Sequence, residues 1–245
     1  PKIGPLPASQ IDPHSERLLR ACKAKDYDLT QDQIRTARQA YFANISYVDD
    51  KIGSILDVLE RCGMAENTII VFTSDHGDML GERGLWFKMN FFDGSARVPL
   101  MIASPQLKQR RIDEAVSTLD VLPTLADLAG LSLDDIMPWT DGVSLVDVAS
   151  GVQSRDIVPM EYAAEGTIAP MVSVREGQWK LNLCKADPPQ FFNLADDPDE
   201  LRNVADVAEY QDAFIRLTNW AEKRWNLELY DQQVRASQAR RHVVY

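Results

Sequence analysis

Apolar residues recur at steps of three and four between residues 33 and 62, and this spacing predicts one long helix. Gly63 follows it and is well placed to end the helix in a left-handed conformation. The apolar positions form a single stripe: Tyr41, Ile45, Val48, Ile52, Ile55 and Leu59.

Two short apolar runs follow, at residues 68–73 and 98–103, and residues 119–129 then predict a helix that ends at Gly130. The first run is unbroken and rich in β-branched side chains, which is typical of a strand buried on both faces of a parallel sheet. This alternation of helices and strands predicts a doubly wound α/β layer.

The pattern changes after about Asp156, where shorter strands and a turn at Glu176-Gly177 predict an antiparallel sheet. A helix near residues 207–225 is expected to cover one face of that sheet. We therefore expect two domains, residues 1–150 and residues 151–245. The predicted strands of the second are 157–162, 171–175, 179–184 and 191–194.

Charge and cysteine content limit the partners and the compartment. The chain has 26 basic and 37 acidic residues and a net charge of −11, which argues against nucleic acid or an anionic membrane as a partner. Its three cysteines show no metal-ligand spacing, so we expect free thiols and a cytoplasmic location. The first residue is Pro1 rather than Met, and we expect the chain to be part of a longer protein.

The first predicted strand leads into Asp75 and His76, followed by Gly77. A carboxylate beside an imidazole at a strand end suits a divalent cation. The same residues also fit a plain strand-end turn in which Asp75 binds a backbone amide. A glycine-bearing loop with basic groups comes next and contains Lys88. A metal-binding pair followed by a lysine is what a tetrahedral oxyanion requires, which favours the metal interpretation.

These segments resemble the sulfatase family, in the expected order along most of residues 33–205. The resemblance implies one half of an alkaline-phosphatase-like α/β sandwich with a small C-terminal antiparallel α+β subdomain. It implies that Asp75 and His76 bind a metal and that Lys88 is a catalytic, sulfate-binding residue. Calcium is the expected metal, with magnesium or manganese as alternatives. The matching segments are residues 74–77, 81–88, 97–100, 116–130, 141–145 and 192–205.

Two parts of the family's machinery are not found in this chain. One is the Cys-x-Pro/Ser-x-Arg segment whose cysteine becomes formylglycine, because none of Cys22, Cys62 and Cys184 has that context. The other is an Asp-Asp pair that completes the metal site. We expect both in an N-terminal half of the same protein. This chain alone should then be inactive, and the complete enzyme is expected to be a homo-oligomer.

Residues 78–89 and 160–166 resemble the choline-sulfatase branch of the family. The substrate would be a small sulfate ester, choline sulfate. Its trimethylammonium group needs aromatic faces and a carboxylate, because it forms no strong hydrogen bonds. We expect Glu165 to be that carboxylate, although an exposed strand-end glutamate is the competing interpretation. Trp86, Trp139 and Trp179 fit either a cation pocket or ordinary packing.

Two alternative functions stay open at this point. Esters of tetrahedral phosphorus require nearly the same kind of binding site, so a phosphonate monoester hydrolase or phosphodiesterase is one alternative. A non-catalytic binding or assembly domain is the other. The combination of Asp75, His76 and Lys88 argues against it, because a purely structural module has no need of all three.

Overall fold

The computed structural model describes residues 1–132 and 138–242. The chain groups into two compact units, which are described separately below. Unit 1 contains residues 1–88 and 93–110, and unit 2 contains residues 89–92 and 111–245. The expected division between residues 150 and 151 stays a prediction.

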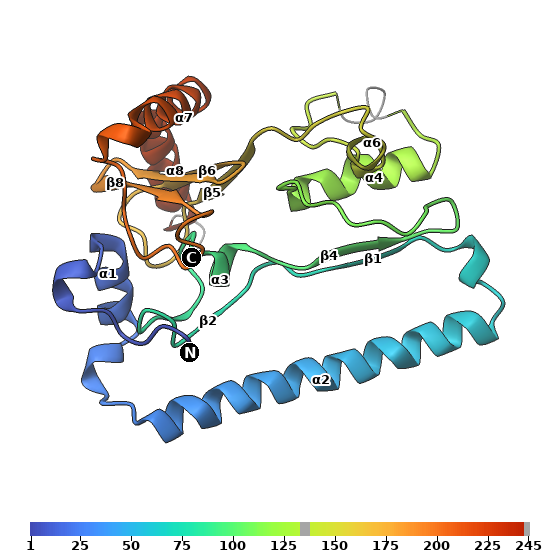
Figure 1. The fold of residues 1–245 in the computed structure, drawn as a ribbon, viewed down its shortest axis with the longest axis horizontal. Helices are drawn as coiled ribbons and strands as arrows, with labels where there is room; N and C mark the ends of the chain where they lie inside the picture. Colours follow the sequence, from blue (N-terminus) through green and yellow to red (C-terminus); the bar gives the residue numbers. More distant parts are fainter. Residues whose placement is uncertain (133–137, 243–245) are drawn as a thin grey trace. The chain divides into compact units, whose positions relative to one another are not determined.

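Unit 1 is dominated by the helix α2, Gln31–Arg61 (Figure 1). Thr30 caps its first turn, since its hydroxyl accepts from the backbone N–H of Gln33 and the Gln33 side chain accepts from the N–H of Thr30. Gly63, at φ +65°, follows the last turn as expected. The other elements of unit 1 are η1 (Ala8–Gln10), α1 (Pro13–Ala21), η2 (Ala24–Asp26), η3 (Ala65–Asn67), β1 (Ile70–Thr73), β2 (Met79–Leu80), β3 (Trp86–Phe87), α3 (Asp93–Ala96) and β4 (Leu100–Ala103).

The predicted strands at 68–73 and 98–103 exist as β1 and β4, but the expectation of a parallel sheet was wrong. The two strands pair antiparallel, with Ile70 opposite Ala103 and Thr73 opposite Leu100. Residues 74–99 join them and contain only a small hairpin and the four-residue α3. A parallel pair would need a long crossover that brings the chain back to the start of β1, and residues 74–99 contain no such helix. β4 therefore runs beside β1 in the opposite direction. Nor is β1 buried on both faces, because all its residues keep some exposed surface.

Unit 2 contains a four-stranded antiparallel sheet in the order β5-β6-β7-β8, as expected. The turn at Glu176-Gly177 joins β6 to β7, with Glu176 opposite Trp179. The helix α7, Gln211–Arg224, covers one face of the sheet (Figure 1). The strands are β5 (Val158–Tyr162), β6 (Met171–Glu176), β7 (Trp179–Cys184) and β8 (Asp187–Asn193).

The core of unit 2 lies between this sheet and α7. Val174, Leu181 and Phe191 occupy neighbouring positions on three strands and are fully buried. They pack with Leu217 of α7, which is also fully buried. Alternate residues of a strand share one face and helix residues four apart share one side, so these apolar positions meet across the layer.

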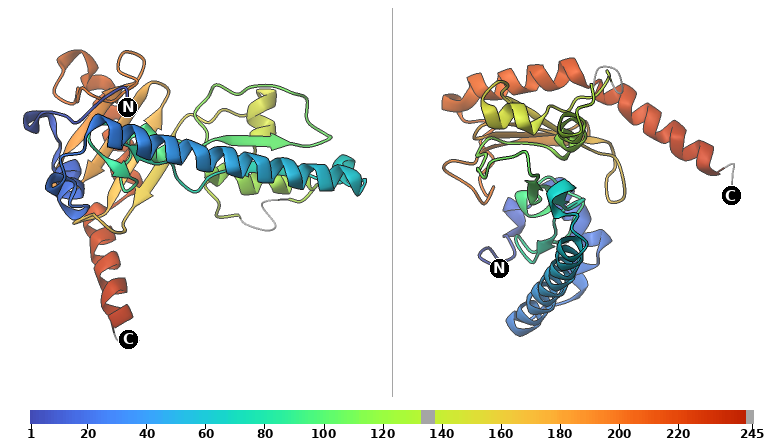
Figure 2. Two further views of the ribbon diagram at one scale, coloured as in Figure 1. Left: turned by 90° about the horizontal axis from the view of Figure 1, so that it is seen from below. Right: turned by 90° about the vertical axis from the view of Figure 1, so that its right-hand side faces the viewer.

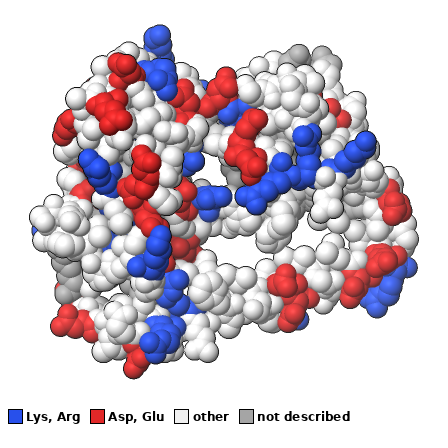
Figure 3. Space-filling view, viewed as in Figure 1, with Lys and Arg blue, Asp and Glu red and all other residues white. Residues whose placement is uncertain are grey.

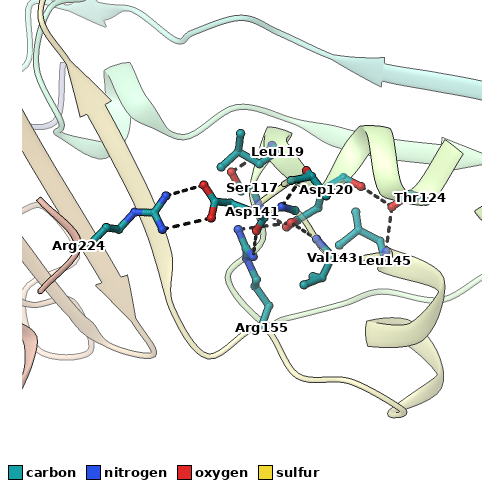
Figure 4. A network of polar contacts seen from close by, with 11 residues as sticks. Ser117, Leu119, Asp120, Thr124, Asp141, Val143, Leu145, Arg155 and Arg224 are labelled. Atoms are coloured by element: carbon teal, nitrogen blue, oxygen red, sulfur yellow. Dashed lines mark hydrogen bonds and ion pairs between the residues drawn. The ribbon is translucent and has the colours of Figure 1, made fainter. Parts of the chain in front are cut away.

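A polar network stabilises the segment before the sheet (Figure 4). Asp120 is completely buried, and its carboxylate accepts from the N–H groups of Ser117 at 2.8 Å and Val143 at 3.0 Å. Arg155 lies 3.4 Å from the same carboxylate. Asp141, by contrast, forms a more exposed ion pair with Arg224 of α7. The elements of this segment are η4 (Thr118–Asp120), α4 (Val121–Leu128) and α6 (Leu145–Ser150).

After η5 (Ala208–Tyr210) and α7, the chain ends in the helix α8, Leu227–His242, which the sequence pattern did not predict. Figure 2 shows α8 running away from the sheet of its own unit. Within the ranges that the structure describes, no helix is both long enough and apolar enough to cross a membrane.

Candidate active site

The loop that follows β1 is held against α3. The N–H of Gly77 donates to the carbonyl of Ser95 at 2.8 Å. A Cβ atom at position 77 would lie only 2.3 Å from the carbonyl oxygen of Gly94. Only glycine therefore permits this approach, which fixes where Asp75 and His76 lie.

Asp75 projects from this loop with 83% of its side chain exposed. Its Oδ1 accepts from the N–H of His76 at 2.9 Å. This backbone hydrogen bond, together with the hydrogen bond from the Ser74 hydroxyl, lowers the pKa of the Asp75 carboxyl. The ionised form, which is the form that binds a metal, is therefore favoured.

The contacts of His76 define which of its ring nitrogens carries the proton. Nδ1 lies 2.8 Å from the carbonyl oxygen of Gly77, and a carbonyl can only accept, so Nδ1 carries the hydrogen. Lys88 Nζ lies 2.9 Å from Nε2, and an ammonium group can only donate. Nε2 of the neutral ring therefore has its lone pair available, which is the arrangement that a metal-binding histidine needs.

Asp75 and His76 fit a shared cation. Asp75 Oδ2 lies 3.4 Å from His76 Nε2. Two neighbouring ligands at about 2.3–2.6 Å from a calcium ion are separated by roughly this distance. No group of three or more His, Cys, Asp or Glu side chains that could hold a metal occurs in residues 1–132 and 138–242. The described part of the chain thus offers two ligands of a site that requires six or more.

Lys88 follows a short hairpin in which Met79 pairs with Phe87 and Leu80 with Trp86. The residues on either side of Lys88 have an unusual backbone: Phe87 has φ +67° and Met89 has φ +79°. Side chains of this size rarely adopt such angles, at a cost of about 1–3 kcal/mol each. The surrounding structure must therefore hold the hairpin in place.

Glu165 belongs to unit 2, whereas Asp75, His76 and Lys88 lie together in unit 1. Glu165 is exposed, and its backbone carbonyl accepts from the Tyr162 hydroxyl at 3.0 Å. Desolvation, together with the charge of the Glu165 carboxylate, raises the pKa of Tyr162 to about 12. Tyr162 is therefore a neutral aromatic side chain next to Glu165 at physiological pH.

The three tryptophans that fit either a cation pocket or ordinary packing have different surroundings. Trp179 stacks on Phe191 at 5.2 Å and belongs to the core of unit 2. Trp139 is 74% exposed. Trp86 pairs with Leu80 in the hairpin before Lys88.

Sequence reasoning did not single out Glu161, although it lies in β5 only four residues before Glu165. Its carboxylate accepts from the indole N–H of Trp225 at 2.7 Å and from the Tyr230 hydroxyl at 3.3 Å. The sequence around Glu161 shows only the alternation of side chains along β5. That pattern does not indicate hydrogen-bond partners more than 60 residues away.

Comparison with known proteins places the arrangement in a family. A sulfatase family model matches residues 8–131, and a model of the C-terminal region of N-sulphoglucosamine sulphohydrolase matches residues 81–227. The chain belongs to the sulfatase family.

The chain is 52% identical to the choline-sulfatase of Rhizobium meliloti (strain 1021) over 248 residues, which cover 100% of this chain and 48% of that protein. It is 34% identical to arylsulfatase K of Danio rerio, over 76% of this chain and 38% of that protein. The chain thus spans about half, or less, of the length of these relatives.

Solved structures confirm the expected fold. A 2-O GAG sulfatase superposes with a TM-score of 0.78 at 24% identity, covering 91% of this chain and 52% of that one. The phosphonate monoester hydrolase of Agrobacterium radiobacter gives a TM-score of 0.66 at 29% identity, covering 86% and 43%. The chain therefore has the mixed α/β architecture of the alkaline-phosphatase-like sulfatases, with a four-stranded antiparallel sheet in its C-terminal part.

Proposed function

We propose that this chain provides the sulfate-binding lysine and two metal ligands of a sulfuric ester hydrolase that converts choline sulfate to choline and sulfate. The observation that supports this most is the convergence of three groups in unit 1. Asp75 Oδ2 and Lys88 Nζ lie 3.4 Å and 2.9 Å from the same atom, His76 Nε2. Two ligands and an ammonium group that meet at one point suit the anionic sulfate group of an ester bound beside a cation.

Each residue has a defined part in this proposal. The Asp75 carboxylate and His76 Nε2 hold the divalent cation, for which calcium is preferred and magnesium or manganese are alternatives. When bound, the cation neutralises charge on the sulfate oxygens. The Lys88 ammonium binds another sulfate oxygen and stabilises the charge that develops there. Nε2 has a single lone pair, so it serves either a cation or Lys88, and Lys88 must turn from His76 to reach a sulfate.

The nucleophile is proposed to come from outside this chain. The family resemblance implies a formylglycine, and none of the three cysteines present lies in the required sequence context. We therefore propose that the catalytic partner is an N-terminal half of the same protein, and that residues 1–245 alone do not turn over substrate.

The preference for choline sulfate rests on the relative at 52% identity and on Glu165. We propose that the Glu165 carboxylate balances the trimethylammonium charge and that aromatic faces such as Tyr162 surround it. Tyr162 is the last residue of β5 and Glu165 lies in the turn that follows, and the hydrogen bond from the Tyr162 hydroxyl to the Glu165 carbonyl orients the Tyr162 ring.

The test uses the complete enzyme and its Lys88→Ala variant with choline sulfate. Replacement of one charge-stabilising group should lower kcat/KM by roughly 100-fold or more, while the melting temperature should barely change. A variant that keeps its activity but loses its thermal stability would show that Lys88 is structural. No hydrolysis of any ester by the intact enzyme would favour a non-catalytic domain.

One alternative activity has a specific observation in its favour. The structural similarity at 29% identity to a phosphonate monoester hydrolase points to phosphorus esters. The kcat/KM values for choline sulfate and for a phenyl phosphonate monoester, measured on the same preparation, distinguish the two. A higher value for the phosphonate would replace the sulfatase assignment.

A further inference from the structure

Lys88 directly follows the β2–β3 hairpin, whose backbone conformation is energetically costly. Positive φ angles occur at Gly81, Arg83 and Gly84 in the turn, and again at Phe87 and Met89. Glycine accepts such angles freely, but the other three residues do not. The β2–β3 pair contributes only two residues from each strand, so its own hydrogen bonds are few. Contacts from outside the hairpin must therefore hold Lys88 in position.

Two residues on one side of α2 make such contacts. Arg38 Nη1 donates to the carbonyl of Leu80 at 2.9 Å and to the Glu82 carboxylate at 2.5 Å. One turn further along, the Tyr41 hydroxyl donates to Asp78 at 3.0 Å. Residues three apart on a helix face the same way, so both side chains can form hydrogen bonds with one hairpin.

Glu82 links the contacts of Arg38 to the backbone of the hairpin. Its second carboxylate oxygen accepts from the N–H of Leu80 at 2.6 Å. The Arg38 and Glu82 side chains are only 24% and 30% exposed. An ion pair that is partly shielded from water and bonded to the backbone at both sides is more rigid than a surface pair.

We propose that Arg38 and Tyr41 of α2 are positioning residues, which fix the β2–β3 hairpin and thereby place Lys88 Nζ for sulfate binding. The proposal rests on the function proposed above for Lys88. The direct links run through Leu80, Glu82 and Asp78, and the pairing of β2 with β3 carries their effect to Phe87, which precedes Lys88. Neither Arg38 nor Tyr41 is required to touch the substrate.

The same helix offers a matched control. Arg35, one turn before Arg38, pairs with Asp32 at 3.0 Å, and both side chains are largely exposed. Arg35→Ala therefore removes an arginine and an ion pair from α2 without touching the hairpin. Arg38→Ala removes both hairpin contacts, which the same Nη1 atom makes. Arg38→Lys keeps a positive charge opposite Glu82 but loses the planar guanidinium that holds this donor in place.

The experiment measures kcat and KM for choline sulfate in the complete enzyme, with each variant made in the wild-type and the Lys88→Ala backgrounds. Misplacement of a catalytic group by about 1 Å can cost up to roughly 100-fold, so Arg38→Ala should lower kcat by about 10- to 100-fold. Arg38→Lys should recover part of this loss, and Arg35→Ala should have little effect. In the Lys88→Ala background, Arg38→Ala should cause almost no further loss, because the group that it positions is gone.

Hydrogen exchange gives a second measurement that is independent of activity. The N–H of Gly81 donates to the carbonyl of Leu85 within the hairpin. Arg38→Ala or Arg38→Lys should speed its exchange, and Arg35→Ala should not.

Two outcomes would overturn the positioning role. One is that Arg38→Ala and Arg35→Ala behave alike in both measurements. The other is an equal loss from Arg38→Ala with and without Lys88, which would mean that Arg38 acts on general stability. Full activity of Lys88→Ala alone would instead refute the proposed function itself, and the positioning role with it.

Discussion

At the scale of single residues, the site depends on which hydrogen bonds surround one imidazole ring. The carbonyl of Gly77 accepts a hydrogen bond from Nδ1–H of His76, and this leaves Nε2 facing both Asp75 and Lys88. A sequence motif indicates the residue types in such a site but not the tautomer. The structure defines the tautomer through the backbone of residues 75–77, because the carbonyl of Gly77 faces Nδ1 of the His76 ring.

Calcium binding by the complete enzyme should depend on Asp75. Asp75→Ala removes a charged oxygen ligand, so the affinity should fall at least about tenfold, as measured by isothermal titration calorimetry. Asp113→Ala is the control, because Asp113 is a comparably exposed carboxylate that pairs with Arg111. Equal affinities of the two variants would contradict the assignment of Asp75 as a ligand.

The charge of Glu165 should matter for a cationic substrate only. Glu165→Gln in the complete enzyme should lower kcat/KM for choline sulfate by roughly tenfold and leave a neutral aryl sulfate unaffected. Glu161→Gln is the matched control, since that carboxylate is bonded to Trp225 and Tyr230. If Glu161→Gln alone showed the selective loss, recognition of the cation would belong to Glu161.

At the scale of secondary-structure elements, the buried and exposed carboxylates of unit 2 should differ in their contribution to stability. Asp120→Ala leaves Arg155 and the N–H groups of Ser117 and Val143 without this partner in a buried place (Figure 4). Loss of one member of a buried pair costs about 3–5 kcal/mol of unfolding free energy. Asp141→Ala, which removes a more exposed pair with Arg224, should cost at most about 1 kcal/mol. Urea unfolding measures both, and equal losses would contradict this assignment of stability.

Elements with a strong local pattern were predicted well, and those without one were not. The long helix follows from its apolar spacing, and the β6–β7 hairpin follows from Glu176-Gly177 between two apolar runs. The α8 helix lacks an apolar stripe, so nothing in its pattern distinguished it from a polar tail. The direction of β4 relative to β1 depends on the connection between them, which the apolar runs do not encode.

The same limit applies to the site. That Asp75, His76 and Lys88 lie together could be expected because a short stretch of sequence contains all three, while their roles stay predictions. Arg38 and Glu82 are 44 residues apart, and no local pattern pairs them. Their contact follows from the packing of the hairpin against α2, which only the structure shows.

At the scale of the whole molecule, α2 presents an apolar surface that unit 1 does not cover. Among its residues only Ile34 is buried. In Figure 3, the helix along the lower edge shows mostly uncharged surface between a few charged side chains. Large apolar patches on proteins usually mark interfaces. The exposed apolar side chains of α2 are Phe42, Ile45, Tyr47, Val48, Ile55, Leu56 and Val58, each at least 40% exposed.

The final prediction concerns what covers this surface. The relatives extend well beyond the region matched here, and we propose that the N-terminal half of the same protein packs on α2. Ile55 is 66% exposed in this chain. In the complete enzyme it would be buried, so Ile55→Asp should lower the unfolding free energy by about 2 kcal/mol or more.

The matched control is Ile215→Asp, because Ile215 lies on α7 with 53% exposure and should stay exposed to solvent, at a cost within about 0.5 kcal/mol. Chemical unfolding of the complete enzyme and of residues 1–245 separates the contributions. The large effect of Ile55→Asp should occur only in the complete enzyme, since residues 1–245 leave this side chain exposed in either variant. A small effect of Ile55→Asp in both proteins would mean that the apolar side of α2 faces solvent or a different partner, and that the N-terminal half packs elsewhere.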